Sequence, residues 1–284
     1  MHGCGSDFVL NGKVPSVARP QYKRQCDQVL KRFDKFLHAP APGVASLREA
    51  ICTLEDKSVS AYIVGGLPRE LAMHGPSISV RDVDVVVEQH DLTSTLKLLG
   101  NNQVGRTRFG GYRLLVDEFW RVDLWTVQSA WAFHKFPLLF QSANDLMSST
   151  FFNLDAIGIA LSNRIRPRHI IEHRFFDGLS RNLIDINFKP NPFPLVCGTR
   201  ALIMADRYSF ALSPGLASFV RDLYNVKGLN AFIEAQVSHY KRRVVPDSML
   251  QLWLSYIRSN VYGTSPVYLP GTHQNQLGLF TPAA

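Results

Sequence analysis

The chain has 284 residues, of which 46% are hydrophobic and 19% charged, so its composition excludes a wholly disordered polypeptide. Its 31 Lys and Arg residues exceed its 23 Asp and Glu residues, and the resulting net charge of +8 favours a polyanionic partner such as nucleic acid or a nucleotide. The four cysteines form no CxxC pair, which argues against a zinc ribbon or a redox motif and predicts reduced thiols in a cytoplasmic protein. No secretory signal or membrane-spanning run is evident, so we expect no membrane partner.

The first half of the chain predicts a mixture of helices and strands. Apolar residues at helical spacing indicate helices at residues 19–38 and 44–57, which belong to an N-terminal extension, residues 1–58. Strands and helices then alternate. We predict a strand at 59–66, a helix at 67–75, a strand at 81–88, a helix at 91–100, a hairpin at 112–127 and a strand at 151–162.

The second half predicts helices from Pro194 onward. The prolines of "NFKPNPFP" predict a boundary near residue 190, and the last residues contain no Lys, Arg, Asp or Glu. We therefore expect a mixed domain at 59–190, a small helical domain at 191–262 and a disordered or loosely draped tail at 263–284.

Two carboxylates stand inside an apolar run. Asp82 and Asp84 are two residues apart on a predicted strand and therefore point to the same face, while Val83 and Val85 face the core. Two like charges this close repel each other, and a divalent cation offsets the repulsion. Mg²⁺ or Mn²⁺ prefers such oxygen ligands, and Mg²⁺ usually fills its other positions with water and substrate phosphates. The pair therefore predicts a site for a metal and a nucleoside triphosphate.

A glycine pair precedes the carboxylates. Gly65 and Gly66 follow a predicted strand and open a helix, where a backbone without side chains lets a phosphate approach the free N–H groups. Arg69 lies in the first turn of that helix, within reach of the same phosphates. A third acid, Asp123, lies in the apolar run "WRVDLWTV" and would join the pair if the two strands are neighbours. Taken singly, the Asp-Val-Asp pair is equally compatible with an exposed strand edge and the glycines with a turn.

These motifs resemble a known family. "GGLPREL" followed by "RDVDVVVE" is similar to the head domain of class II CCA-adding enzymes and bacterial poly(A) polymerases, within the polymerase β nucleotidyltransferase superfamily. The weaker similarity of "FFNLDAIGIAL", "FFDGLSRNLIDI" and "TRALIMADRYSFALSP" extends it over roughly residues 60–215. The resemblance implies an α+β fold, in which helices flank a mixed sheet and a small all-helical domain follows.

The resemblance also implies a reaction. A nucleoside monophosphate would pass from a nucleoside triphosphate to an acceptor hydroxyl, such as the 3′ end of a tRNA-like RNA, with release of pyrophosphate. The implied catalytic and metal-binding residues are Asp82, Asp84 and Asp123. The implied nucleotide-binding residues are Gly65, Gly66, Arg69, Asp155 and Arg200.

The chain departs from the family pattern at several positions. Ser149, Thr150 and Phe151 replace the family's two arginines and aspartate, and Asp155 replaces its asparagine. The family's template for choosing C and A is not present in the "ADRY" helix, and the helical part is short for gripping a whole tRNA. These departures favour a divergent nucleotidyltransferase over a CCA-adding enzyme.

The acceptor remains open at this stage. Basic residues in the first helix and in "RIRPRHIIEHR" favour RNA, whereas a protein or a small molecule would also provide a hydroxyl. A catalytically inactive, nucleic-acid-binding scaffold of the same fold is the competing hypothesis. The sequence does not indicate the oligomeric state.

Overall fold

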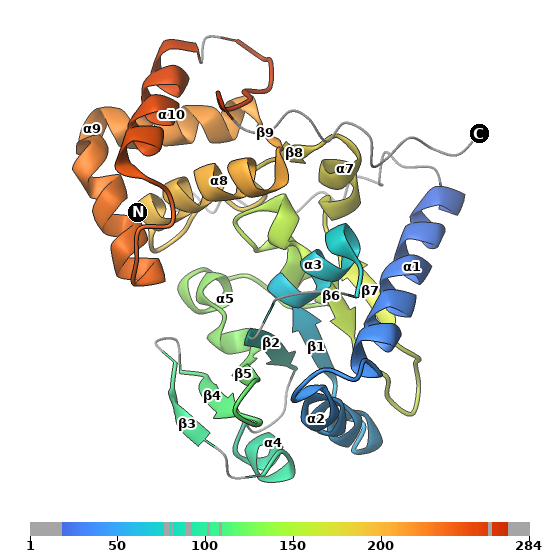
Figure 1. Ribbon diagram of the computed structural model, residues 1–284. Coiled ribbons are helices and arrows are strands. Elements are labelled where there is room, and N and C mark those ends of the chain that lie inside the picture. The colour runs from blue at the N-terminus through green and yellow to red at the C-terminus, as the bar shows by residue number, and fades with distance from the viewer. Residues whose placement is uncertain are drawn as a thin grey trace, which may run out of the picture.

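The computed structural model describes residues 19–76, 80, 82–88, 92–100, 103–107, 110–260 and 263–271. In this part of the chain one mixed sheet forms the centre of the molecule (Figure 1). Its strands lie side by side in the order β3 (Gln103–Arg106), β4 (Tyr112–Leu115), β5 (Arg121–Thr126), β2 (Asp82–Val87), β1 (Ala61–Val64), β6 (Ile157–Ala160) and β7 (His169–Glu172). Strands β2 and β5 are parallel, and the other neighbouring pairs are antiparallel.

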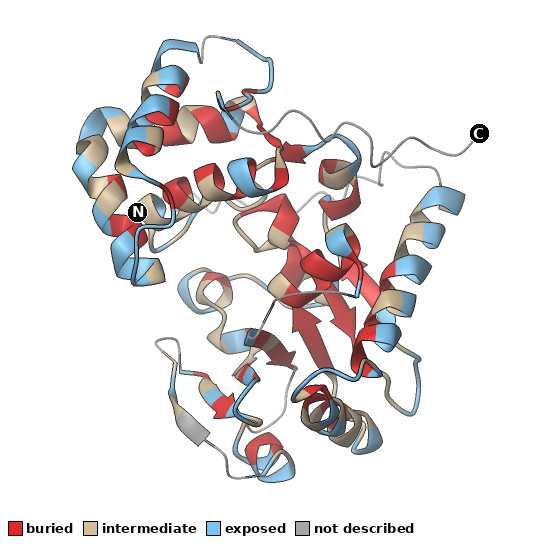
Figure 2. Cartoon of the chain, viewed as in Figure 1, coloured by how far each residue is buried: buried red, intermediate tan, exposed pale blue. Residues whose placement is uncertain are grey.

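One face of the sheet packs against helices. These are α1 (Arg19–Leu37), α2 (Val44–Asp56), α3 (Gly66–His74) and α4 (Leu92–Leu98). Because side chains alternate along a strand, Val83 and Val85 of β2 point into this layer, where they are 0% and 2% exposed. Phe33 of α1 belongs to the same apolar cluster, and Figure 2 shows the central strands β1 and β6 as buried along their length. Burying each such side chain stabilises the fold by about 1.5–3 kcal/mol.

The other face of the sheet is covered by a smaller apolar cluster. Tyr62, Val64 and Val86 of this face pack with residues from the segments that follow β5. These segments are η1 (Val127–Ser129), α5 (Trp131–Lys135) and α6 (Ala143–Ser148), and the short helix η2 (Asn153–Asp155) comes just before β6. Val86 is the residue of β2 that belongs to this cluster. Asp84 and Asp82, which precede Val86 on the same face, lie outside it.

The C-terminal part is mostly helical, as predicted. It comprises α7 (Phe175–Ser180), β8 (Leu183–Ile184), α8 (Pro194–Tyr208), β9 (Ala211–Leu212), α9 (Pro214–Tyr240) and α10 (Asp247–Asn260). Helix α9 bends at Gly228, whose φ of 73° and ψ of 178° are not helical. Apolar residues of this part, such as Phe232 of α9 and Trp253 of α10, belong to the same buried cluster as the sheet. The domain boundaries therefore remain predictions, because one core crosses residue 190.

Of the two alternatives expected for the tail, disorder is wrong for residues 263–271, which lie against the helical part. Val267 forms a β-bridge with Leu212 of β9, and the Nε1 of Trp253 donates a hydrogen bond to the Pro270 carbonyl at 3.0 Å. Leu269 is 2% exposed. Residues 1–18 and 272–284 lie outside the described residues, so the predictions for them stay untested. None of the helices in the described part of the chain combines the length and apolarity needed to span a membrane.

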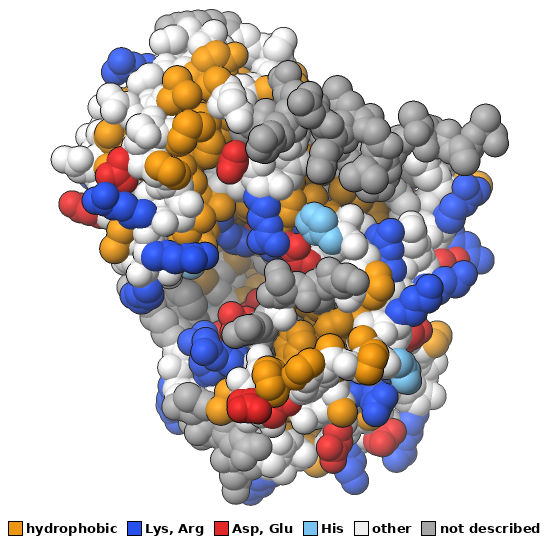
Figure 3. All heavy atoms as spheres, viewed as in Figure 1, with side chains coloured by type: hydrophobic (Ala, Val, Ile, Leu, Met, Phe, Trp, Pro, Cys, Tyr) orange, Lys and Arg blue, Asp and Glu red, His pale blue; other side chains and the backbone are white. Residues whose placement is uncertain are grey.

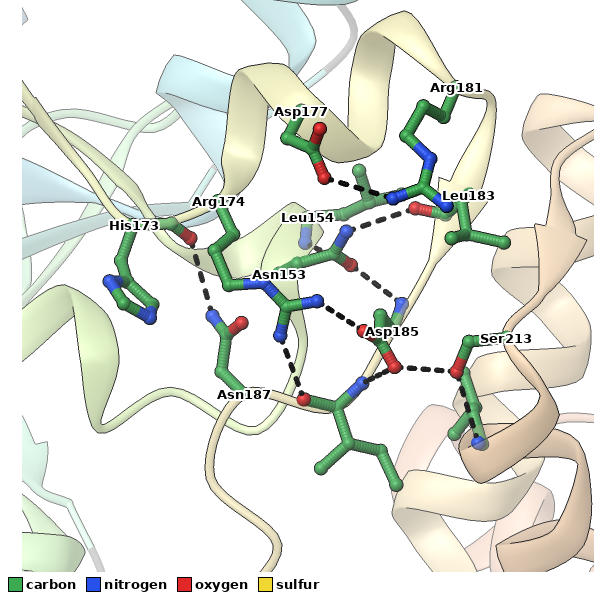
Figure 4. A network of polar contacts seen from close by, with 12 residues as sticks. Asn153, Leu154, His173, Arg174, Asp177, Arg181, Leu183, Asp185, Asn187 and Ser213 are labelled. Atoms are coloured by element: carbon green, nitrogen blue, oxygen red, sulfur yellow. Dashed lines mark hydrogen bonds and ion pairs between the residues drawn. The ribbon is translucent and has the colours of Figure 1, made fainter. Parts of the chain in front are cut away.

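A polar network joins the sheet to the helical part (Figure 4). The buried Asn153 of η2 donates to the Leu183 carbonyl at 2.9 Å and accepts from the Leu154 and Asp185 amides at 2.9 and 2.8 Å. Asp185 in turn accepts a hydrogen bond from Ser213, whose hydroxyl caps the N-terminus of α9. The network therefore connects η2, β8 and α9 through hydrogen bonds of Asn153, Asp185 and Ser213.

We predict that Asn153→Ala lowers the free energy of unfolding by about 2–4 kcal/mol. The substitution leaves a buried carbonyl and two buried amides without their partner, and each such loss costs about 1–3 kcal/mol. Urea unfolding followed by circular dichroism measures the change. Asn260→Ala, at an exposed position of α10, is the control and should shift stability by less than about 0.5 kcal/mol. Equal stability of the two variants would contradict the structural role of Asn153.

Candidate active site

The register of the sheet brings the predicted acids together. In the parallel ladder of β2 and β5, Asp84 is the direct partner of Asp123, and Asp82 is the partner of Arg121. Neighbouring strands are about 4.8 Å apart, and partners in a ladder project from the same face. The expected pairing of the Asp123 strand with the Asp82–Asp84 strand is therefore confirmed. Asp82 is exposed, whereas Asp84 and Asp123 are half-buried.

The glycine turn lies beside these acids. Gly65 follows β1 with a φ of 70°, a conformation that favours glycine, and a Cβ built on it would lie 3.8 Å from Oδ2 of Asp84. Gly66 is the first residue of α3, so the free N–H groups of this helix start next to the carboxylates. The structure thus places the predicted phosphate-binding turn and the predicted metal ligands at one end of the sheet.

Asp84 carries an uncompensated charge. Burial, and next the negative charge of Asp123, raise the pKa of the Asp84 carboxyl to about 6, although Arg200 acts in the opposite direction. A carboxylate that is costly to ionise in the metal-free protein gains most from a divalent cation. Within the part of the chain that the structure describes, no three Asp, Glu, His or Cys side chains are arranged so that they could hold a metal ion. Two neighbouring carboxylates of this site would nevertheless fit Mg²⁺, which usually completes its coordination with water and substrate phosphates.

Asp123 is engaged by an arginine that the sequence analysis missed. Arg113 of β4 is its cross-strand partner, and its guanidinium donates to both carboxylate oxygens at 2.7 and 2.6 Å. The alternation of β4 contained the signal. Leu114 is buried in the core, so Arg113 has to point to the opposite face, where Asp123 lies.

The two arginines expected to bind the nucleotide are held by Asp155. Arg69 and Arg200 both form ion pairs with the Asp155 carboxylate, and Arg200 lies 2.9 Å from each of its oxygens. The Nε of Arg69 also donates to the Tyr208 hydroxyl at 3.1 Å. Asp155 therefore does not stand alone opposite a phosphate, because it sits between two cations and cancels part of their charge. The charge of Asp155 in turn raises the pKa of Arg200.

A second acid holds α3 against α8. Glu70, which is 4% exposed, accepts hydrogen bonds from the Tyr208 hydroxyl at 2.6 Å and from Arg207 at 2.9 Å. Tyr208 also contacts Arg69, so the two networks share one residue. Sequence reasoning missed this contact, since its partners are 138 residues apart.

The positions that depart from the family pattern have structural roles. The hydroxyl of Ser149 donates to the Leu146 carbonyl at 2.7 Å, and that of Thr150 donates to the Met147 carbonyl at 2.9 Å. Both therefore satisfy carbonyls at the end of α6. The ring of Phe151 packs edge-on against Phe152, with centroids 4.7 Å apart.

Charged side chains also gather around the site on the surface. Figure 3 shows the molecule hollowed between its helical part and the sheet, with acidic and basic side chains along the hollow. Asp84, Asp155 and Arg200 interact electrostatically from both sides of this boundary. The site is therefore a mixed-charge cluster.

The chain aligns with known structures over most of its length. It matches a Thermotoga maritima CCA-adding enzyme complexed with tRNA at a TM-score of 0.57 and 17% identity, covering 79% of this chain and 53% of that one. A CCA-adding enzyme with CTP gives a TM-score of 0.59 at 15% identity, covering 86% and 56%. A tRNA-processing enzyme gives 0.53 at 19% identity, covering 75% and 57%. This is the nucleotidyltransferase fold of CCA-adding enzymes.

The fold class and the resemblance predicted from the sequence are thereby confirmed. The chain spans somewhat more than half the length of these CCA-adding and tRNA-processing enzymes. No protein-family model matches the sequence, and no curated protein sequence matches it. The nucleotidyltransferase fold is therefore recognised here through structure, at a sequence identity that leaves the activity to be argued from the site.

We predict that Asp84→Asn stabilises the metal-free protein above pH 6. Because the folded-state pKa of Asp84 is about 6, against an ordinary value of 3.8, the folded protein loses stability as the pH rises from 4 through 6. Asparagine does not ionise, so the variant should gain about 1–3 kcal/mol over the unchanged chain between pH 4.5 and 7.5. Urea unfolding in EDTA at both pH values measures this gain. Asp222→Asn, at an exposed carboxylate of α9, should show no such trend, and a pH-independent effect of Asp84→Asn would contradict the prediction.

Proposed function

We propose that the chain is a metal-dependent nucleotidyltransferase that moves a nucleoside monophosphate from a triphosphate to an acceptor hydroxyl, most readily at an RNA 3′ end. The observation that carries the proposal is the direct pairing of Asp84 with Asp123 beside the Gly65 turn, on this fold. Carboxylates, a phosphate-accepting turn and a helix start are the parts that phosphoryl transfer uses, because the reaction depends on positioning and charge neutralisation.

Each residue has a distinct role in this proposal. Asp82 and Asp84 would hold a divalent cation, with Asp123 completing its site, and the cation would supply positive charge against the triphosphate. Gly65 and Gly66 let the phosphates approach the start of α3. Asp123 accepts the proton of the attacking hydroxyl. The oxygen of the acceptor hydroxyl forms the new bond to the α-phosphorus, while the bond from that phosphorus to the pyrophosphate oxygen breaks.

The choice of RNA as acceptor rests on charge and on the structural neighbours. The net charge is +8, and one structural neighbour is complexed with tRNA. In the predicted basic segment, Arg164 and Arg166 are exposed on the β6–β7 connection and remain available to phosphates. Arg168 and Arg174 instead pair with Glu55 and Asp185, so they support the fold.

An inactive RNA-binding scaffold is the second candidate. It is favoured by the pairing of Arg69 and Arg200 with Asp155, and of Asp123 with Arg113, since these contacts occupy groups that catalysis needs. It is opposed by the retention of half-buried carboxylates, because a buried charge without a function is costly. A protein or a small molecule remains an alternative acceptor for an active enzyme.

We predict label transfer to RNA when the full chain is incubated with each α-labelled nucleoside triphosphate, Mg²⁺ and total RNA. Asp84→Ala should reduce the transfer about 10²–10³-fold, a loss typical of removing one electrostatic group from an active site. Asp222→Ala, at an exposed position of α9, is the matched control and should retain activity. Gel electrophoresis of the labelled products measures the transfer.

The other outcomes decide between the alternatives. Asp84-dependent labelling of protein instead of RNA would replace the acceptor. Binding of RNA without any transfer, equal in the Asp84→Ala variant, would contradict the enzyme and support the scaffold.

A further inference from the structure

Arg113 belongs to a row of charged residues that crosses three strands. Arg113 of β4 is the ladder partner of Asp123 on β5, which is the ladder partner of Asp84 on β2. All three side chains project from the same face of the sheet. The guanidinium is therefore next to the carboxylate pair that the proposed function assigns to a cation.

The ion pair uses both oxygens of Asp123. Nε of Arg113 lies 2.7 Å from Oδ1, and Nη2 lies 2.6 Å from Oδ2. This two-pronged geometry is the strong form of an arginine–carboxylate contact. A divalent cation bound to the same oxygens would stand beside a like charge, so the two cations oppose each other at this carboxylate.

In the metal-free protein, another positive charge has to offset the three carboxylates. Asp82, Asp84 and Asp123 share one face, and the repulsion among their charges has to be offset. Arg113 supplies a positive charge of the protein's own, which its two hydrogen bonds hold against Asp123.

Exchange of this counter-charge is inexpensive. The side chain of Arg113 is 47% exposed and that of Asp123 is 19% exposed, so the arginine can move into water without opening the core. Water screens an ion pair with this exposure, so even a two-pronged contact here is much weaker than the same contact in a buried site. A cation that enters with a triphosphate therefore competes with a contact that it is able to displace.

We propose that Arg113 is an exchangeable internal counter-ion that competes with a divalent cation for Asp123. The proposal rests on the proposed function, because it concerns the same carboxylates. Asp123 is then either bound to Arg113 or available to a cation. The apparent affinity for a cation at Asp123 is reduced by the fraction of molecules in which Arg113 holds it.

The test is a titration of the full chain with Mn²⁺ alone, in which free Mn²⁺ is followed by electron paramagnetic resonance. Arg113→Gln should bind Mn²⁺ about three- to tenfold more tightly than the unchanged chain, in line with the modest strength of a partly exposed pair. Arg121→Gln is the matched control. Arg121 carries the same charge on the same face of β5 beside Asp82, and its loss should change affinity by less than about twofold.

Two further variants link the effect to Asp123. In Arg113→Gln/Asp123→Asn the gain in affinity should vanish, because the contested carboxylate is absent. Arg113→Lys keeps the charge without the fork and should give a smaller gain, and it also serves if the glutamine variant does not fold. Equal Mn²⁺ affinity of Arg113→Gln and the unchanged chain would overturn the proposal.

The remaining outcomes are also decisive. A gain that persists in Arg113→Gln/Asp123→Asn, or an equal gain in Arg121→Gln, would reduce Arg113 to a general electrostatic effect and overturn the competition. Binding of Mn²⁺ to none of the variants would overturn the proposed metal-dependent function as well. Because the first results leave Mn²⁺ binding by the unchanged chain intact, the two failures are distinguishable.

Discussion

The parallel pairing of β2 with β5 is the constraint on which the rest of the site depends. It places Asp84 directly beside Asp123 and leaves both on the face that the apolar clusters do not fully cover. The features around these acids accommodate the concentration of negative charge. The glycine turn removes side chains next to Asp84, and arginines approach from β4 and α8.

The cations near the acids are already engaged by the protein. Arg113 is held by Asp123, and Arg69 and Arg200 are held by Asp155. In a polar cluster of limited solvent access, a charge without a partner is costly, so the metal-free protein pairs these three arginines with its own carboxylates. Binding a highly charged substrate would then exchange one set of ion pairs for another, with a smaller net gain than the number of arginines suggests.

Much of the fold and the site can be predicted from local patterns. Asp82, Asp84 and Asp123 are recognisable because each interrupts an apolar strand, and the glycine pair is recognisable because it separates a strand from a helix. Contacts between distant segments are not recognisable in this way. Glu70 and Tyr208 are far apart in sequence, and no local pattern around either residue predicts their contact.

The same limit explains the misjudged tail. The uncharged, proline-containing composition after residue 263 indicates disorder only if the segment has no surface to pack on. Here β9 provides one, because Val267 forms a β-bridge with Leu212. Strand β3 was not predicted either, because its four residues carry no alternation of their own and depend on pairing with β4. Arg113 was visible in the alternation of β4, but its meaning required the register of the next strand.

The bend of α9 has a consequence for the reach of the helical part. Helix α9 starts after Ser213, which caps its N-terminus. At Gly228 the backbone takes torsion angles that residues with a side chain rarely adopt, so the helix does not continue in a straight line. Beyond the bend, the last turn comes close to Arg200, whose charge lowers the pKa of His239 after the larger effect of burial. One residue without a side chain thus sets the direction of the second half of α9, and with it the approach of His239 to Arg200.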